Sequence, residues 1–203
     1  MINLKKVQKK FNNNYVLEDI NLSINKGELI YIHGINGCGK STLFKIICDI
    51  LEIDSGIITI DEDTHIGALI ENPAFLERDT IKYNLKYLAD FNDNYDEQKI
   101  RELCQLFHLD FDSRTKMKNY SLGMRQKVGI IQAVMENQNL ILLDEPTRGL
   151  DEESIESFYT LINKLVSEGK SVIIASHDKY EELKFTSSYQ LKKGRLIYDE
   201  KKE

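Results

Sequence analysis

Cysteine, proline and tryptophan are scarce in this sequence: its 203 residues include three cysteines, two prolines and no tryptophan. An odd number of cysteines cannot all pair, and Cys38, Cys48 and Cys104 lack C-x-x-C spacing, so we expect free thiols in a reducing cytoplasm. Glycine numbers only 11 while hydrophobic residues make up 41%, a mixture that excludes collagen-like repeats and disorder. Apolar runs such as residues 140–143 are far shorter than the roughly 20 residues of a membrane-spanning helix. We therefore expect a soluble globular chain.

Positive charge is also in deficit. The chain has 27 lysines and arginines against 33 acidic residues, a formal net charge of -6, which argues against a nucleic-acid partner bound by overall positive charge. Residues 1–10 are polar and basic without an apolar stretch, so we expect no secretory signal peptide.

Short apolar runs alternate with stretches of helical periodicity. The predicted strands are residues 2–7, 17–24, 28–33, 139–143 and 171–175, with a turn at Asn12, Asn13 and Asn14 and a hairpin over residues 189–198. One predicted helix begins near Lys40 and carries Leu43, Ile46, Ile47 and Ile50 on one face, and another follows Asp151. Strands that alternate with helices predict an α/β fold, in which helices cover both faces of a parallel sheet.

Residues 76–119 are polar and favour helix, with Leu85, Leu88, Leu103, Leu106 and Phe107 at helical spacing. We expect this segment to be a helical subdomain inserted into the α/β core. Its tyrosines and phenylalanines are expected to belong to the core.

The turn after the run at residues 28–33 has the composition of a phosphate-binding loop. Residues 34–42 read GINGCGKST and fit G-x-x-x-x-G-K-[ST] between a strand and a helix. Glycines allow backbone N–H groups to surround phosphate oxygens, a lysine reaches the β- and γ-phosphates, and the serine hydroxyl can hold Mg²⁺. A dinucleotide-binding G-x-G-x-x-G pattern does not fit. The candidate nucleotide-binding residues here are Gly34, Asn36, Gly37, Cys38, Gly39, Lys40, Ser41 and Thr42.

Two acids and a histidine end the later buried strands. Asp144 and Glu145 directly follow the run at residues 140–143, where Asp144 would reach the Mg²⁺ and Glu145 would orient or deprotonate the attacking water. His177 follows the run at residues 171–175, and a catalytic role for it depends on that strand lying beside the strand of the acids. The candidate catalytic residues are therefore Lys40, Glu145 and His177.

In this order, the motifs resemble those of the ATP-binding cassette (ABC) family over almost the whole chain. Residues 34–42 match the family's Walker A motif, residues 140–145 its Walker B motif and catalytic acid, and residues 146–151 its D-loop, while His177 matches its switch histidine. Residues 120–126, YSLGMRQ, stand where the family carries its LSGGQ signature. The resemblance implies a P-loop NTPase (RecA-like) parallel-sheet core with an antiparallel β subdomain and an inserted α-helical subdomain. It implies one nucleotide-binding domain, with residues 1–71 and 137–203 as core and β subdomain and residues 72–136 as helical subdomain.

The same resemblance implies how nucleotide and partners are bound. Phe11 falls at the position that stacks on adenine, with Tyr15 as the alternative, and Ser121 and Gly123 would contact the γ-phosphate held by a second cassette. Ser121 also has the residue type and place of a helix N-cap, and the two roles are compatible. ATP would thus join two identical or different cassettes, and Mg²⁺ would be held by Ser41, Asp144 and Glu71.

Three departures from the family pattern stand out. Glu71 occupies the position where relatives usually carry Gln, Leu122 and Met124 replace a Gly and the Gln of the signature, and we expect no C-terminal extension after Glu203. Glu71 and the S-L-G-M signature resemble exporters of the bacitracin and lantibiotic resistance type.

The function expected from this resemblance is ATP hydrolysis that powers export by a separate membrane-spanning permease subunit. The cassette would lie in the cytoplasm, peripheral on the inner face of the membrane, with no nucleic-acid partner. The alternatives are a soluble ABC ATPase and an ATP-binding regulator without transport.

Overall fold

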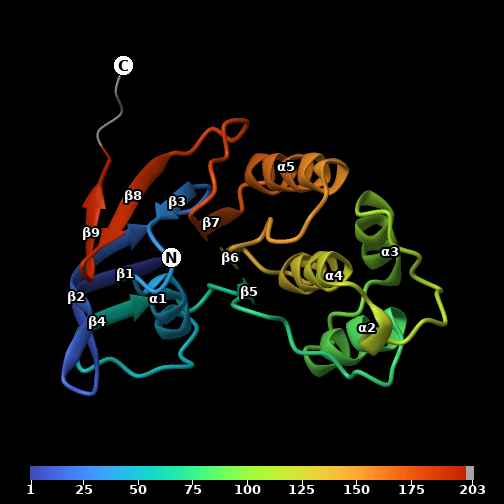
Figure 1. Cartoon of the computed structure of the whole chain (residues 1–203), viewed down its shortest axis with the longest axis horizontal. Helices are drawn as coiled ribbons and strands as arrows, with labels where there is room; N and C mark the ends of the chain where they lie inside the picture. Colours follow the sequence, from blue (N-terminus) through green and yellow to red (C-terminus); the bar gives the residue numbers. More distant parts are fainter. Residues whose placement is uncertain (200–203) are drawn as a thin grey trace.

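The computed structural model describes residues 1–199 and arranges the strands of that range in two sheets (Figure 1). The smaller sheet is antiparallel with the order β2-β1-β4, formed by β1 (Ile2–Phe11), β2 (Asn14–Ile24) and β4 (Ser55–Ile60). The first two strands are longer than predicted, because Asn12 and Asn13 alone make the turn, both with positive φ. Asn14, predicted in the turn, is instead the first residue of β2. The sheet confirms the antiparallel β subdomain.

The larger sheet has the order β5-β6-β7-β3-β8-β9. Its strands are parallel except the last, which pairs antiparallel with its neighbour and forms the predicted hairpin. The strands are β5 (Ile66–Leu69), β6 (Leu140–Asp144), β7 (Ser171–Ser176), β3 (Leu29–His33), β8 (Ser187–Lys192) and β9 (Arg195–Tyr198). This mainly parallel arrangement confirms the α/β P-loop core.

Helices cover both faces of the larger sheet. Successive side chains of a strand point to opposite faces, and every residue of β6 is buried, so both faces must be covered. Leu140 and Leu142 belong to the cluster that also contains the apolar side of α1 (Lys40–Ile47). Ile141 and Leu143 belong to the opposite cluster, with α4 (Leu122–Val134) and α5 (Glu152–Ser167). In Figure 1, α1 and α4 accordingly lie on opposite sides of β5 and β6. The two helices therefore pack on opposite faces of the larger sheet.

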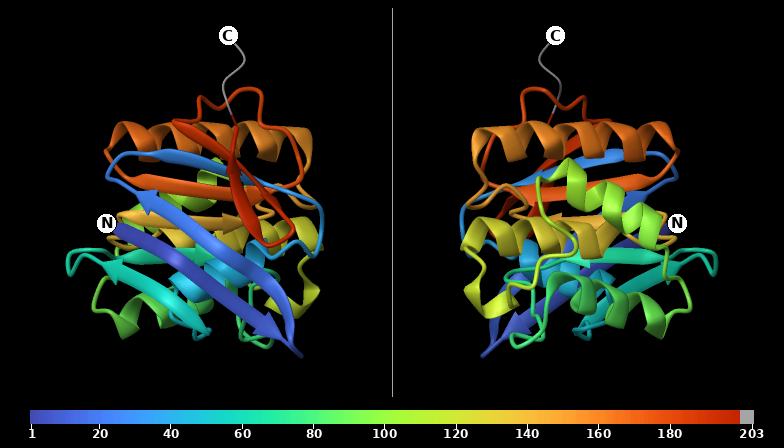
Figure 2. Two further views of the ribbon diagram at one scale, coloured as in Figure 1. Left: turned by 90° about the vertical axis from the view of Figure 1, so that its left-hand side faces the viewer. Right: turned by 90° about the vertical axis from the view of Figure 1, so that its right-hand side faces the viewer.

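Three helices occupy the segment predicted as an insertion. These are α2 (Ile81–Phe91), α3 (Glu97–Leu106) and α4, with a short 3-10 turn, η1 (Met117–Asn119), before α4. Figure 2 shows the small sheet at one end of the molecule and these helices at the other. The division into a core and a helical subdomain of residues 72–136 is kept as a proposal. The predicted end of the core at residue 203 and the expectation about a C-terminal extension fall outside the described residues.

Two expectations about buried side chains are wrong. Ile50 is 67% exposed because α1 ends at Ile47 and Asp49 takes a positive φ, which breaks the helical phase. Tyr83, Tyr87 and Phe91 recur at about one-turn spacing on the outer face of α2 and are 52%, 43% and 72% exposed. Leu88 on the same helix is also exposed. We call Tyr83, Tyr87 and Phe91 the aromatic stripe.

Within residues 1–199, no helix is both long and apolar enough to cross a membrane.

Candidate active site

The loop between β3 and α1 has the backbone that phosphate binding requires. Gly37 and Gly39 adopt φ values of 78° and 111°, and Gly39 is the residue from which α1 begins. A Cβ on Gly39 would lie 3.0 Å from the Leu17 side chain and 3.1 Å from the Val16 carbonyl, so both conformation and space call for glycine there. The N–H groups of the first turn of a helix have no partner within the helix and carry partial positive charge. The loop therefore presents an anion-binding helix N-terminus.

A polar cavity of about 360 Å³ opens over this loop. It brings together segments far apart in the chain: Phe11, Val16, Asn36, Gly37, Gly39, Lys40, Ser41, Thr42, Glu71, Asp144 and Glu145. Gly34, Cys38 and Tyr15 line the neighbouring cavity instead. Phe11, 45% exposed at the end of β1, is thus the aromatic residue on the phosphate side. This placement favours Phe11 over Tyr15 as the side chain that meets a base.

Lys40 is buried but its charge is paired. Its Nζ donates to the Gly34 carbonyl at 2.8 Å and lies 3.2 Å from Glu145 Oε1, while the residue is only 5% exposed. A buried ammonium needs such partners, because loss of hydration is costly. The side chain is therefore held over the loop at the position where phosphate oxygens would replace or join these acceptors.

Asp144 and Ser41 form the part of the cavity suited to a divalent cation. Ser41 Oγ donates to Asp144 Oδ2, and Oδ1 of the same carboxylate is buried without a hydrogen bond of normal geometry from residues 1–199. Burial raises the pKa of Asp144, although the bond from Ser41 and the Glu71 backbone N–H oppose the rise. Hydroxyl and carboxylate oxygens are the ligands that Mg²⁺ prefers. The residues present fit Mg²⁺, with Oδ1 as the oxygen still to be satisfied.

Glu145 sits at the end of β6 with a positive φ of 47°. β6 and β7 are neighbours, so Glu145 faces the end of β7, where its Oε2 accepts from Ser176 Oγ at 2.7 Å and lies 2.8 Å from His177 Nδ1. Burial alone would raise the pKa of Glu145, but the bonds from Ser176, Lys40 and His177 outweigh it and the pKa is lowered. The carboxylate is thus ionised at neutral pH and can accept a proton or orient a water.

Ser121 and Gly123 lie elsewhere. Ser121 caps α4, its Oγ accepting from the Met124 N–H, and a Cβ on Gly123 would come within 2.4 Å of the Gly149 carbonyl. Neither residue lines the polar cavity, and α4 packs on the face of the sheet opposite α1. The structure therefore does not bring Ser121 and Gly123 together with the other predicted site residues in the polar cavity.

Several residues that shape the site were not singled out from the sequence. Ser176 anchors Glu145, and Thr147, which is buried, lies within hydrogen-bond distance of Asp178 and Tyr180. Gln126 is 4% exposed, and its Nε2 donates to the carbonyls of Glu145 and Pro146 at 3.0 and 3.1 Å. Ser176 had a usable signal, a hydroxyl at the end of an apolar strand beside His177. Gln126 belonged to the signature-like segment of residues 120–126, but no pattern in the sequence pointed to its bonds with these carbonyls.

Replacing Gln126 with Leu is expected to lower the free energy of unfolding by about 1–3 kcal/mol, because the buried Pro146 carbonyl loses this donor, while the Glu145 carbonyl keeps its bond from the Arg148 N–H. Urea unfolding measures the change. Gln132→Leu on the same helix is the matched control, since the buried Gln132 Nε2 has no hydrogen-bond partner within residues 1–199 and its loss is expected to be neutral or stabilising. Equal destabilisation by both variants would contradict the assigned role of Gln126.

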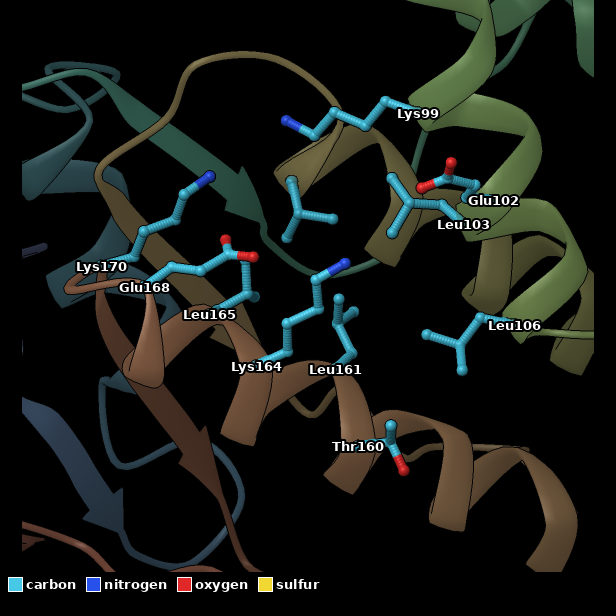
Figure 3. Close-up of a pocket in the computed structure, with 11 residues that line it drawn as sticks. Lys99, Glu102, Leu103, Leu106, Thr160, Leu161, Lys164, Leu165, Glu168 and Lys170 are labelled. Carbon is cyan, nitrogen blue, oxygen red and sulfur yellow. The ribbon is translucent and has the colours of Figure 1, made fainter.

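Another cavity, of about 340 Å³, lies between α3 and α5 (Figure 3). Leu103, Leu106 and Leu161 line it, together with positively charged lysines and negatively charged glutamates. None of the motif residues lines this cavity. The polar cavity over the phosphate loop is therefore the candidate site for a nucleotide.

Known proteins resemble this chain in sequence and in fold. The family model described as "ABC transporter" matches residues 17–148. The uncharacterized ABC transporter ATP-binding protein YdbJ of Bacillus subtilis is 35% identical over 87% of this chain, which spans 61% of YdbJ. The lantibiotic transport ATP-binding protein SrtF of Streptococcus pyogenes is 30% identical over 87% of this chain and 80% of its own length.

A solved structure shares the fold. It is a dimeric structure of a post-hydrolysis state of the ATP-binding cassette MJ0796, bound to ADP and Pi, which matches with a TM-score of 0.86 and 26% identity. The match covers 98% of both chains. The similarity therefore extends over the β subdomain, the core and the helices alike.

Proposed function

This chain belongs to the ABC transporter family, and from that premise we propose that it binds and hydrolyses ATP to power transport by a separate membrane-spanning subunit. One observation carries the proposal: Lys40, Ser41, Asp144 and Glu145 converge on the phosphate loop, with His177 against Glu145. A protein that only bound the nucleotide would not need Glu145 at the phosphate loop with His177 against it.

The chemistry assigned to these residues is direct attack of water on the γ-phosphorus. Lys40 and the N–H groups of the loop hold the phosphates and neutralise their charge. Glu145 orients the water and takes its proton while the oxygen bonds to the γ-phosphorus and the bond to the β–γ bridging oxygen breaks, giving ADP and phosphate. His177 keeps the Glu145 carboxylate in place and reaches the outgoing phosphate.

Mg²⁺ is the proposed metal, held by Ser41 and Asp144, with Glu71 as a third candidate. When bound, Mg²⁺ supplies positive charge to the β- and γ-phosphate oxygens. The buried Oδ1 of Asp144 supports the assignment.

The second partner proposed is another cassette, identical to this chain or different from it. Neither Ser121 nor Gly123 lines the polar cavity, and α4 packs on the face of the sheet opposite α1, which supports a contact between the capped N-terminus of α4 and an ATP held by a second copy. The MJ0796 cassette, which this chain resembles, is described as dimeric. ATP binding would close this pair of cassettes, and hydrolysis would open it.

The membrane subunit is proposed to meet the surface formed by residues 71–76 and the aromatic stripe. Leu76 is 40% exposed, and Asn84 ties its backbone to α2, which carries the stripe. Exposed aromatic side chains gathered on one helix are characteristic of interaction surfaces. The cassette would then be peripheral on the inner face of the membrane. Export of membrane-active peptides is the transport activity proposed, supported by similarity to SrtF and by Glu71.

This surface can be tested. We expect the triple variant Tyr83→Ser, Tyr87→Ser, Phe91→Ser to lose most of its association with membranes of cells that also produce the membrane subunit, because it loses the exposed aromatic area. The measurement is the fraction of tagged protein that sediments with membranes. Tyr198→Ser, an exposed tyrosine on β9, is the matched control and should sediment like the unaltered protein. Equal sedimentation of the triple variant, the control variant and the unaltered protein would count against the docking surface.

Phosphate release distinguishes the alternatives. The purified chain with ATP and Mg²⁺ is expected to release phosphate, whereas a regulator would bind ATP without release. A soluble ABC ATPase would release phosphate but never sediment with membranes.

A further inference from the structure

An ion pair outside the motifs links α1 to the rim of the nucleotide cavity. Lys45 lies one helical turn beyond Ser41, and its Nζ donates to Glu71 Oε1 at 2.7 Å. Glu71 follows β5 with a positive φ of 56°, so its backbone places the side chain at the rim. Lys45 itself does not line the cavity, whereas Glu71 does. The lysine therefore reaches the site only through this carboxylate.

The charges around the cavity explain why such a partner matters. Three carboxylates line it, those of Glu71, Asp144 and Glu145, against one lining lysine, Lys40, which already pairs with Glu145. The triphosphate of ATP adds further negative charge to the same space. Like charges that line one small cavity repel each other. A carboxylate at the rim without a cation partner would therefore oppose nucleotide binding.

We propose that Lys45 is a positioning residue, which holds the Glu71 carboxylate at the rim and offsets its charge so that the cavity can accept ATP. The proposal rests on ATP binding as the function of this cavity. It assigns a role to a lysine outside the phosphate loop and explains how an acidic residue is accommodated beside the phosphates.

The pair is poorly placed to act as a structural link. Lys45 and Glu71 side chains are 33% and 55% exposed, and ion pairs with this exposure contribute little to folding stability. Loss of the lysine should therefore appear in nucleotide affinity and leave the unfolding midpoint nearly unchanged. The two readouts separate a positioning role from a structural one.

The experiment measures the dissociation constant of a fluorescent ATP analogue, with EDTA and separately with Mg²⁺, by fluorescence titration. Lys45→Met is expected to weaken binding about fivefold, which corresponds to roughly 1 kcal/mol, and Lys45→Arg is expected to restore it. In EDTA, where Glu71 has no metal ion to hold, the double variant Lys45→Met, Glu71→Gln removes both charges and is expected to bind more tightly than Lys45→Met alone, close to the unaltered protein. Lys86→Met, which breaks the exposed Lys86–Asp90 pair on α2, is the matched control.

The outcomes are distinct. If Lys45→Met binds ATP as tightly as the unaltered protein, Lys45 has no positioning role. If the double variant stays as weak as Lys45→Met, the lysine acts on the nucleotide directly and the proposed route through Glu71 is wrong. If the unaltered protein itself fails to bind the analogue, the proposed function fails instead. A lowered unfolding midpoint in Lys45→Met that matches the loss of affinity would assign the pair to folding.

Discussion

Replacing Lys40 with Met is expected to weaken ATP binding about a hundredfold or more. Its ammonium is the one lysine group lining the described cavity, and charge-assisted hydrogen bonds to phosphate contribute roughly 1.5–3 kcal/mol each. Each 1.4 kcal/mol corresponds to about a factor of ten in the dissociation constant. Fluorescence titration with an ATP analogue measures the loss, and phosphate release should fall with it.

The choice of Met keeps the side-chain length, so the packing against the loop is retained while the charge is removed. The variant does leave Glu145 without its cation, and that carboxylate keeps only the donors Ser176 and His177. Circular dichroism and urea unfolding must therefore show a folded chain before affinity is compared. Lys86→Met, on exposed α2, controls for the loss of a lysine in general. A folded Lys40→Met protein with unchanged affinity would refute the nucleotide site.

Most of the fold and the motif part of the site could be predicted, because both depend on local sequence. The phosphate loop is a single continuous segment whose glycine positions, such as Gly39, are required by its own backbone. The contact of Glu145 with His177 follows from topology, since buried strands that end in polar residues bring those residues to one edge when the strands are adjacent. Periodicity and spacing contain this information.

Other features depend on distances between segments that no local pattern encodes. The Lys45–Glu71 pair joins residues 26 positions apart, and the bonds from Gln126 join a helix face to carbonyls beyond the next strand. The exposed side of α2 was predicted as core because aromatic residues are usually buried. Only the packing of α2 shows that Ile81 and Leu85 face inward while Tyr83 and Tyr87 face outward.

Replacing Glu145 with Gln is expected to lower the rate of phosphate release about a hundredfold or more while ATP binding persists. General-base catalysis contributes roughly 10²–10⁴ in rate, and a neutral amide cannot accept the proton of the attacking water. The amide can still accept from Ser176, so the local fold should be kept. Retained affinity with lost turnover is the combination that separates this variant from Lys40→Met.

The same variant tests the proposed pairing of cassettes. If ATP joins the phosphate loop of one copy to Ser121 of another, Glu145→Gln should accumulate as an ATP-dependent dimer, because the bridging γ-phosphate is no longer cleaved. Size-exclusion chromatography with and without ATP measures the dimer fraction, and the added change Ser121→Ala should reduce it while leaving the Lys40 site intact. A Glu145→Gln protein that binds ATP but stays monomeric at every concentration would confine the nucleotide to one cassette. Undiminished phosphate release by the Glu145→Gln variant would show that Glu145 is not the catalytic base.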